Sequence, residues 1–143
     1  MAIFLDTGFF LGLCLPKDSF HENSKRLLQE MSKGTYGLIY TSPYIIAETS
    51  TLLLIRTHNH LGLLKKFETL VFGDKRFFQI LSWTPTLDAE VFKLFLKLNR
   101  KAKSKKEYFS YIDVTSIYLC QYHQIENILS YDSHFDIILN RIF

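Results

Sequence analysis

Four acidic residues, in four separate segments of the sequence, are the strongest candidates for chemistry in this chain. They are Asp6, Glu48, Asp113 and Asp132. Carboxylates gathered without a counter-charge are costly, because two of them about 5 Å apart repel each other by roughly 3 kcal/mol at an effective dielectric near 20. Such a group is stable only if some members are protonated or a divalent cation holds them. Oxygen ligands without a nearby set of His and Cys favour Mg²⁺ or Mn²⁺ over Zn²⁺.

A cation held by these carboxylates would act on phosphate esters. It would polarise a phosphodiester oxygen and lower the pKa of a bound water, and a second cation would stabilise the leaving oxygen. The water would be the nucleophile, so this chemistry needs no serine, cysteine or histidine. The sequence contains neither the Cys/His spacing of a zinc site nor a glycine-rich phosphate loop. The residue types therefore indicate metal-assisted hydrolysis.

The elements that must position the acids can be predicted from hydrophobic patterns. Short apolar runs rich in branched and aromatic residues predict four strands, over 2–6, 37–41, 77–83 and 124–130. Helical patterns fill the intervals between them and follow the last. These helices are expected over 7–15, 19–33, 43–57, 59–71, 87–101, 110–123 and 133–139. Strands alternating with helices predict an α/β fold with a parallel sheet covered on both faces, in three α/β/α layers.

Capping residues define the starts of several helices. Ser42 followed by Pro43 is a strong signal, because it joins an N-cap to a proline at the first helical position. Further N-caps are expected at Ser19, Thr86 and Ser110. Glu22 would complete a capping box with the first of these. The last of them puts Asp113 in the first turn of its helix.

These elements predict that the four acids share one cleft. In a parallel sheet the carboxyl ends of all strands face the same edge, and ligands bind in the crevice there. Asp6 ends the first strand and Asp132 follows the fourth. Glu48 lies about one turn into the helix after the second strand, and Asp113 begins the buried helix before the fourth. We therefore expect all four at this edge.

Each acid also has a purely structural interpretation. Asp113 would complete a capping box with Ser110, while Asp6 and Asp132 would cap the helices that follow them. Capping and metal binding are compatible, because a helix N-terminus attracts anions. Glu48 falls on an apolar stripe, where its alternative is a buried ion pair with a lysine or arginine. The stripe consists of Tyr44, Ile45, Leu52 and Ile55.

Length and composition are those of one globular domain, expected to span residues 1–143. Apolar residues make up 48% and charged residues 22%, which excludes a collagen-like or low-complexity chain. Two cysteines, Cys14 and Cys120, are too few for a disulfide framework. The apolar N-terminus lacks the basic region and cleavage site of a signal peptide, and the apolar stretch 44–55 is too short to span a bilayer. We expect a cytoplasmic protein without a membrane segment.

Positive charge is concentrated in one segment, residues 93–106. Lysine and arginine number 17 against 14 acidic residues, and seven of these cations lie between Val91 and Lys106, where no acid occurs. Such a segment suggests a polyanionic partner and could grip phosphates. Neighbouring aromatic residues could stack on unpaired bases. They are Tyr108, Phe109 and Tyr111. The alternative is a solvated helix end and loop, with the aromatic side chains in the core.

The segments that carry the four acids resemble the PIN-domain family. They read IFLDTGFFLGL, TSPYIIAETSTLL, FSYIDVTSIYLC and ILSYDSHFD, and their order and spacing span the whole chain. The family comprises metal-dependent ribonucleases and includes the VapC-type toxins of toxin–antitoxin pairs. The resemblance implies a PIN-like sheet of four or five parallel strands with an acidic pocket at its carboxyl edge. It also implies Mg²⁺- or Mn²⁺-dependent cleavage of RNA, an antitoxin protein as partner, and a homodimer.

The resemblance further assigns roles to individual residues. It makes the four acids both catalytic residues and metal ligands: Asp6, Glu48, Asp113 and Asp132. Thr7 and Ser130 stand where the family often has hydroxyl residues beside the first and fourth acids. Asp136 is either an auxiliary acid or part of a turn, and His134 contacts a phosphate or lies at the surface. The resemblance thus implies a metal-dependent endoribonuclease, the toxin of a toxin–antitoxin pair. The lysine-rich stretch before Asp113 exceeds the family pattern and bears on which RNA is preferred.

Two other functions remain open. One is a non-catalytic PIN-fold protein that binds RNA or a partner, which the presence of all four acids disfavours. The other is a receiver-type signalling domain, which also clusters acids at strand ends. A receiver would need a phospho-accepting Asp at the end of a central strand and a Lys near a later strand end. The strand over 77–83 carries no acid, and no lysine follows the strand over 124–130.

Overall fold

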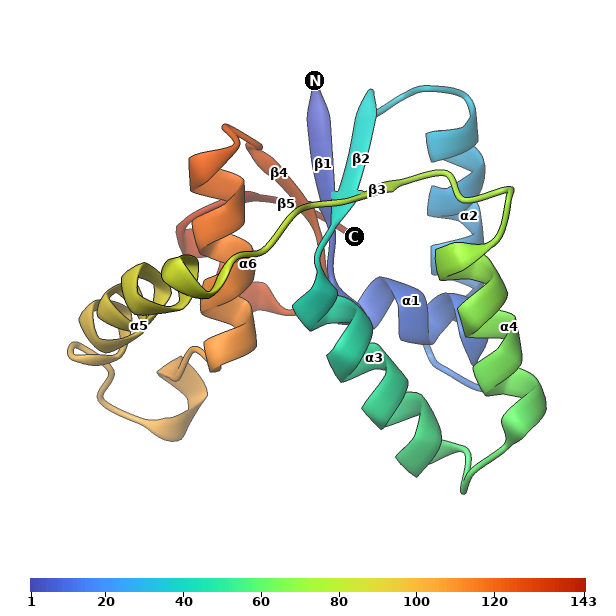
Figure 1. Cartoon of the computed structure of the whole chain (residues 1–143), viewed down its shortest axis with the longest axis horizontal. Helices are drawn as coiled ribbons and strands as arrows, with labels where there is room; N and C mark the ends of the chain where they lie inside the picture. Colours follow the sequence, from blue (N-terminus) through green and yellow to red (C-terminus); the bar gives the residue numbers. More distant parts are fainter.

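The computed structural model describes all residues from Met1 to Phe143, arranged around a central sheet of five parallel strands (Figure 1). The strands are β1 (Ala2–Leu5), β2 (Leu38–Thr41), β3 (Gln79–Ile80), β4 (Asn127–Leu129) and β5 (Asn140–Ile142), in the order β3-β2-β1-β4-β5. The helices are α1 (Thr7–Cys14), α2 (His21–Ser32), α3 (Pro43–Arg56), α4 (Leu61–Phe72), α5 (Pro85–Asn99) and α6 (Tyr111–Tyr122). Two short 3₁₀ turns complete the chain, η1 (Lys105–Glu107) and η2 (Ser133–Ile137).

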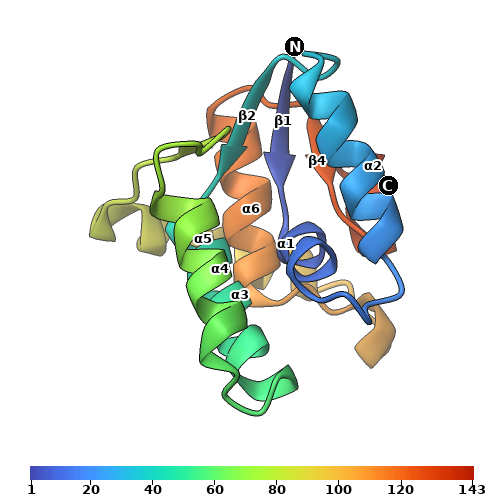
Figure 2. The same cartoon turned by 90° about the vertical axis from the view of Figure 1, so that its right-hand side faces the viewer.

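Helices cover both faces of the sheet, which confirms the predicted three-layer α/β class. Figures 1 and 2 show α1, α2 and α4 on one side of the strands and α5 and α6 on the other. The central strand is β1, where Phe4 lies in register with Tyr40 of β2 and Ile128 of β4. Successive side chains of a strand point to opposite faces, so a fully buried strand needs cover on both. Ile3, Phe4 and Leu5 are all fully buried.

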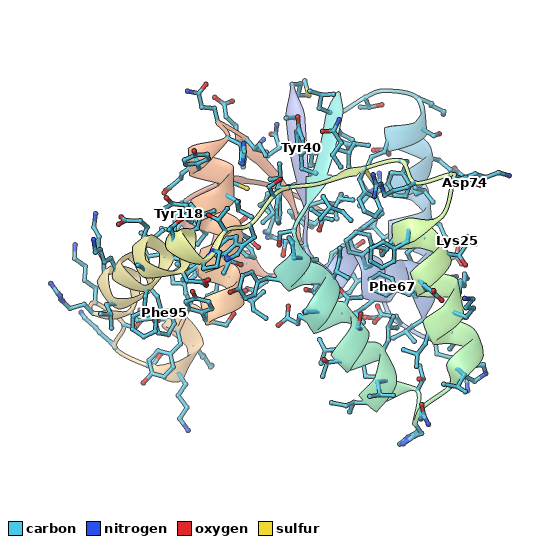
Figure 3. The ribbon with its side chains drawn as sticks, viewed as in Figure 1. Lys25, Tyr40, Phe67, Asp74, Phe95 and Tyr118 are labelled. Atoms are coloured by element: carbon cyan, nitrogen blue, oxygen red, sulfur yellow. The ribbon has the colours of Figure 1, made fainter.

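Aromatic side chains fill the layer between the sheet and α4. The ring of Phe10 in α1 packs edge-to-face against Phe67 of α4 and against Phe78, which precedes β3. Figure 3 shows Phe67 directed from α4 toward α1.

None of the helices combines the length and the apolar character that crossing a bilayer would demand.

The helices that carry two of the acids start where the sequence predicts. Ser42 caps α3, its hydroxyl accepting the Ile45 N–H at 3.3 Å, and Pro43 occupies the first turn. Ser110 caps α6 and accepts the Asp113 N–H at 3.0 Å. Local sequence therefore determines the orientation of both helix starts at the carboxyl edge of the sheet.

Two predicted caps are wrong. Helix α2 begins after Phe20 and not at Ser19, since the Phe20 N–H bonds to the Asp18 carboxylate at 2.8 Å and a turn occupies that position. Helix α5 begins after Thr84 and not after Thr86, because Pro85 takes the first helical position, where it loses no hydrogen bond.

The strands are shorter than predicted, and the hydrophobic pattern does not predict the fifth strand, β5. Only two residues of the predicted 77–83 strand pair with β2, as β3 lies at an edge of the sheet. The predicted last helix is the 3₁₀ turn η2, and β5 follows it as the other edge strand. Asn140 and Arg141 give β5 no apolar run from which a strand could be predicted.

A close helix crossing supports the loop that carries the fourth acid. A Cβ on Gly12 of α1 would lie 2.3 Å from the Ser24 hydroxyl of α2, so only glycine permits this approach. The Ser24 hydroxyl in turn lies 2.8 Å from the Tyr131 hydroxyl, and the Tyr131 ring stacks on Phe20 with centroids 3.9 Å apart. This contact holds the chain immediately before Asp132 against α2.

Candidate active site

Asp6 is held by a distant hydroxyl and not by the helix that follows it. Its carboxylate makes no side-chain capping bond to α1, so capping does not explain its presence. Instead the Ser130 hydroxyl donates to Asp6 Oδ2 at 2.6 Å. The same hydroxyl accepts the Asp132 N–H at 3.0 Å. Ser130 therefore links the first acid to the fourth.

Glu48 is held by the residue next to Asp6. The Thr7 hydroxyl donates to Glu48 Oε2 at 2.5 Å, joining α1 to α3. The predicted alternative, a buried ion pair, is wrong, because no lysine, arginine or histidine forms a salt bridge with Glu48. Thr7 and Ser130, the hydroxyl residues noted in the sequence, thus hold two different carboxylates.

The predicted core-facing stripe of α3 is confirmed at Ile45, is half-buried at Tyr44 and Leu52, and is wrong at Ile55. The buried residues of this helix are Ile45, Thr49 and Leu53, whereas Ile55 is 62% exposed. Glu48 is half-buried beside this face, not on it. Its carboxylate can therefore reach a cavity without entering the core.

Asp113 and Asp132 cap helical turns as their structural interpretations predict. Asp113 Oδ2 accepts the Ser110 N–H at 2.9 Å and completes the capping box of α6. Asp132 Oδ1 accepts the His134 N–H at 2.9 Å at the start of η2. Each carboxylate has a second oxygen, so capping leaves both residues able to bind another group.

All four acids line one cavity at the carboxyl edge of the sheet, where β1 and β2 deliver the chain into α1 and α3 (Figure 1). The cavity measures about 480 Å³. Its lining comprises Asp6, Thr7, Gly8, Leu11, Glu48, Leu52, Arg56, Asp113, Tyr131, Asp132 and Ser133. The structure thus brings together the residues that the sequence predicts.

Arg56 is the one cation among these lining residues, and the sequence did not point to it. It ends α3, two turns beyond Glu48, and lies 3.7 Å from the Asp18 carboxylate. Its helical spacing from Glu48 was a usable signal, but many arginines end helices for reasons of the helix dipole alone.

The carboxylates of the cavity influence each other electrostatically. Burial raises the pKa of Asp6 to about 7; the Ser130 hydrogen bond opposes this rise, and the charges of Asp113 and Glu48 add to it. Burial also raises the pKa of Asp113, with further contributions from Asp132 and Glu48. Asp6, which is 7% exposed and beside other acids, is therefore partly protonated near neutral pH unless a cation offsets its charge.

The carboxylate oxygens of the cavity are suitable ligands for a hard divalent cation, but they are not preorganised around a metal site. No three His, Cys, Asp or Glu side chains stand together as a metal-binding group in this arrangement. The oxygens that line the cavity are nevertheless those that Mg²⁺ and Mn²⁺ prefer, and a buried carboxylate with a raised pKa gains most from a neighbouring cation.

The two other polar candidates of the last segment have different surroundings. Asp136 is bound by Arg141, whose Nε and Nη2 donate to its oxygens at 2.6 and 2.9 Å, so it belongs to the turn and not to the cavity. His134 Nδ1 lies 3.0 Å from Asp132 Oδ1, and its Nε2 hydrogen-bonds the Lys106 carbonyl. That carbonyl and the Asp132 carboxylate raise the pKa of His134, although its partial burial opposes them.

Comparisons with known proteins agree with this geometry. The chain is 27% identical over 137 residues to a VapC ribonuclease of Archaeoglobus fulgidus, covering 96% of this chain and 81% of that protein. Its fold matches the crystal structure of VapC20 of Mycobacterium tuberculosis, a toxin that cleaves the sarcin-ricin loop, with a TM-score of 0.76. The two chains are 21% identical, and the match covers 94% of this one and 93% of the other. No protein-family model matches the chain.

The parallel five-stranded sheet, with the acid-lined cavity at its carboxyl edge, has the PIN-like α/β fold of VapC20. Over most of its length the chain is therefore similar in sequence to a VapC ribonuclease and in fold to a VapC toxin.

Proposed function

We propose that this protein is a metal-dependent endoribonuclease and the toxin of a toxin–antitoxin pair. The observation that carries the proposal is the convergence of four carboxylates, from four segments of the chain, on one cavity. The relative from Archaeoglobus fulgidus is a ribonuclease, and the toxin of similar fold cleaves an RNA loop. Both support RNA as the substrate.

The four acids would hold Mg²⁺ or Mn²⁺ and form the catalytic set. Such a cation, when bound, polarises the scissile phosphodiester and lowers the pKa of a water nucleophile. Thr7 keeps the Glu48 carboxylate turned into the cavity, and Ser130 does the same for Asp6. Arg56, which also lines the cavity, would attract a backbone phosphate toward the acids.

The proposal is tested by cleavage of RNA with the purified full chain. We expect cleavage with Mg²⁺ or Mn²⁺ and none in excess EDTA, and loss of cleavage in Asp6→Asn and Asp113→Asn. Asp74→Asn is the matched control, because Asp74 is an exposed turn residue that does not line the cavity; Figure 3 shows it beside the end of α4. Circular dichroism must show that all variants fold. Full activity in EDTA, or in either cavity variant, would refute the proposal.

A PIN-fold protein that binds RNA or a partner without cutting it is the remaining alternative. It would bind RNA in the same assay and leave it intact under every metal condition. The receiver-type alternative loses support, since the strand order β3-β2-β1-β4-β5 differs from the 2-1-3-4-5 order of such doubly wound proteins.

The assignment as a toxin also implies an antitoxin protein as partner, and we propose a homodimer. Exposed apolar side chains on α3 and α4 offer surface for such contacts. They are Leu54, Ile55, Leu61 and Phe72. Light scattering of the isolated chain tests the dimer, and co-expression with the gene immediately upstream tests the antitoxin.

A further inference from the structure

The basic segment, residues 93–106, carries charges that the protein itself does not neutralise. It runs from α5 through the loop into η1, and of its seven cations only Lys93 is paired, with Glu90 at 3.1 Å. The other six are exposed and form no salt bridge: Lys97, Arg100, Lys101, Lys103, Lys105 and Lys106. So many like charges at close spacing repel one another, and a polyanion would relieve the repulsion.

The nearest acid in the chain does not neutralise these lysines. Glu107 accepts the backbone N–H groups of Lys103 and Ser104, the latter at 3.2 Å, and closes a capping box around η1. Asn99 fixes the base of the loop, since its side chain accepts the Phe109 N–H at 2.9 Å and donates to the Phe109 carbonyl at 3.1 Å. The loop therefore has a defined backbone that displays its cations to solvent.

A single imidazole connects this segment to the acid-lined cavity. His134 hydrogen-bonds the Lys106 carbonyl on one side and lies 3.0 Å from Asp132 Oδ1 on the other. Its ring packs against Phe109, with centroids 5.7 Å apart. Because Asp132 lines the cavity, these contacts place the end of the basic segment beside the site.

The three aromatic residues next to the segment divide between core and surface. Phe109 is buried, and the Tyr111 hydroxyl is bound to Asp88 at 2.6 Å, so neither is free to meet a base. Tyr108 is 54% exposed and directly follows η1. A flat side chain beside unpaired lysines suits a single-stranded nucleic acid, in which bases are available for stacking.

We propose that residues 97–106 bind the phosphate backbone of single-stranded RNA next to the scissile bond, with His134 as the residue that positions this segment against the cavity. The inference rests on the proposed function and deepens it, because it assigns the contacts that hold the RNA beside the cut. An acidic polypeptide is the competing occupant, and the experiment includes it.

The test measures RNA binding against salt concentration. Asp113→Asn is introduced so that the RNA stays intact, and a labelled single-stranded RNA of about twelve nucleotides, within the range that such binding sites cover, is the probe. Lys103→Gln, Lys105→Gln and Lys106→Gln together should weaken binding about tenfold or more. They should also reduce the slope of log K against log salt by about 2, at roughly 0.7 for each phosphate that is no longer neutralised.

The matched control neutralises three other lysines, Lys33, Lys66 and Lys75. They are exposed, form no salt bridge, and lie in or just after α2 and α4, on the other side of the sheet (Figure 1). The control removes the same net charge from the protein, so it separates a local contact from a general electrostatic attraction. It should change neither the affinity nor the slope.

The role of His134 is tested by a double-mutant cycle in the same background. His134→Ala alone should weaken RNA binding, but should add little once the three lysines are neutralised, because it acts through them. His134→Gln, which can still donate to the Lys106 carbonyl, should restore part of the affinity. A fully additive loss would overturn the positioning role.

The outcomes separate this inference from the proposed function. If the unmodified protein cuts RNA but the lysine variant binds it with unchanged affinity and slope, the inference fails and the nuclease assignment stands. Tighter lysine-dependent binding of polyglutamate than of RNA also overturns it, in favour of a protein partner. Absence of cleavage by the unmodified protein contradicts the proposed function instead.

Discussion

The hydroxyl of Ser130 donates a 2.6 Å hydrogen bond to Oδ2 of Asp6 across 124 positions of sequence. The two residues directly follow neighbouring strands, β4 and β1, which pair from Ile3–Asn127 to Leu5–Leu129. The parallel register therefore sets the distance between the first acid of the cavity and the residue that orients it.

Removal of this hydroxyl should shift the pH dependence of cleavage. The Ser130 hydrogen bond lowers the pKa of Asp6, which burial otherwise raises. In Ser130→Ala the pKa of Asp6 should rise further above about 7, so that more of it is protonated at neutral pH. A rise of roughly one pKa unit would lower the ionised fraction of Asp6 at about pH 7 about fivefold, so we expect about fivefold slower cleavage there, with recovery toward about pH 9. A pH–rate profile measures this shift.

Ser116→Ala is the control for that variant. Ser116 is also fully buried, but its hydroxyl has no hydrogen-bond partner, so the substitution breaks no hydrogen bond. Its pH–rate profile should match that of the unmodified protein. If both serine variants shift the profile equally, the effect is one of packing and the orienting role of Ser130 is contradicted.

Asp6 should destabilise the protein at alkaline pH when divalent cations are absent. Its pKa is raised from 3.8 in the unfolded chain to about 7 in the folded one, so its contribution is fully favourable below about pH 4 and is lost as pH rises through about 7. The free energy of unfolding should fall by about 3 kcal/mol between about pH 5 and about pH 8. Urea denaturation in EDTA at both pH values measures this difference.

Asp6→Asn should remove most of that decline, and the variant should be more stable than the unmodified protein at the higher pH in EDTA. The amide oxygen can still accept the Ser130 hydroxyl, so no buried group loses its partner. Mg²⁺ should raise the melting temperature of the unmodified protein more at the higher pH than at the lower, because it binds the ionised carboxylate. Equal stability of the two proteins at the higher pH would contradict the buried charge.

Thr7→Val should slow cleavage about tenfold, the equivalent of roughly 1.4 kcal/mol, while leaving the fold intact. Valine matches threonine in shape but cannot donate to Glu48, whose carboxylate would then lose the bond that holds it toward the cavity. Thr7→Ser keeps the donor and should restore most of the rate. Single-turnover kinetics separate this effect from RNA binding. Failure of serine to rescue would show that the methyl group, and not the hydroxyl, is required.

Asp88→Asn should weaken the contact between α3, which carries Glu48, and α6, which carries Asp113. Tyr44 of α3 and Tyr111 of α6 both donate to Asp88 Oδ1 at 2.6 Å, and the Trp83 indole donates to Oδ2 at 3.1 Å. An asparagine side chain has one acceptor oxygen and cannot receive all three donors. We expect a lower melting temperature together with slower cleavage, checked by calorimetry and kinetics. Asp74→Asn should change neither.

Local sequence determined the elements and the residue types of the site. The apolar run of β1, the Ser42–Pro43 start of α3 and the Ser110–Asp113 capping box depend on neighbours within one helical turn, so they could be predicted before any fold was known. The alternation of strands and helices then indicated a parallel sheet, whose carboxyl edge collects the residues that follow its strands.

Only the tertiary structure decided which groups meet. Thr7 reaches Glu48, Ser130 reaches Asp6 and His134 reaches the Lys106 carbonyl across long stretches of chain, through contacts that depend on strand register and helix packing. The edge strand β5 exists because β4 offers it hydrogen-bonding groups, not because Asn140 or Arg141 favours a strand. The sequence alone determines which side chains the protein has. The packing of the helices against the sheet determines which of those side chains lie close enough to interact.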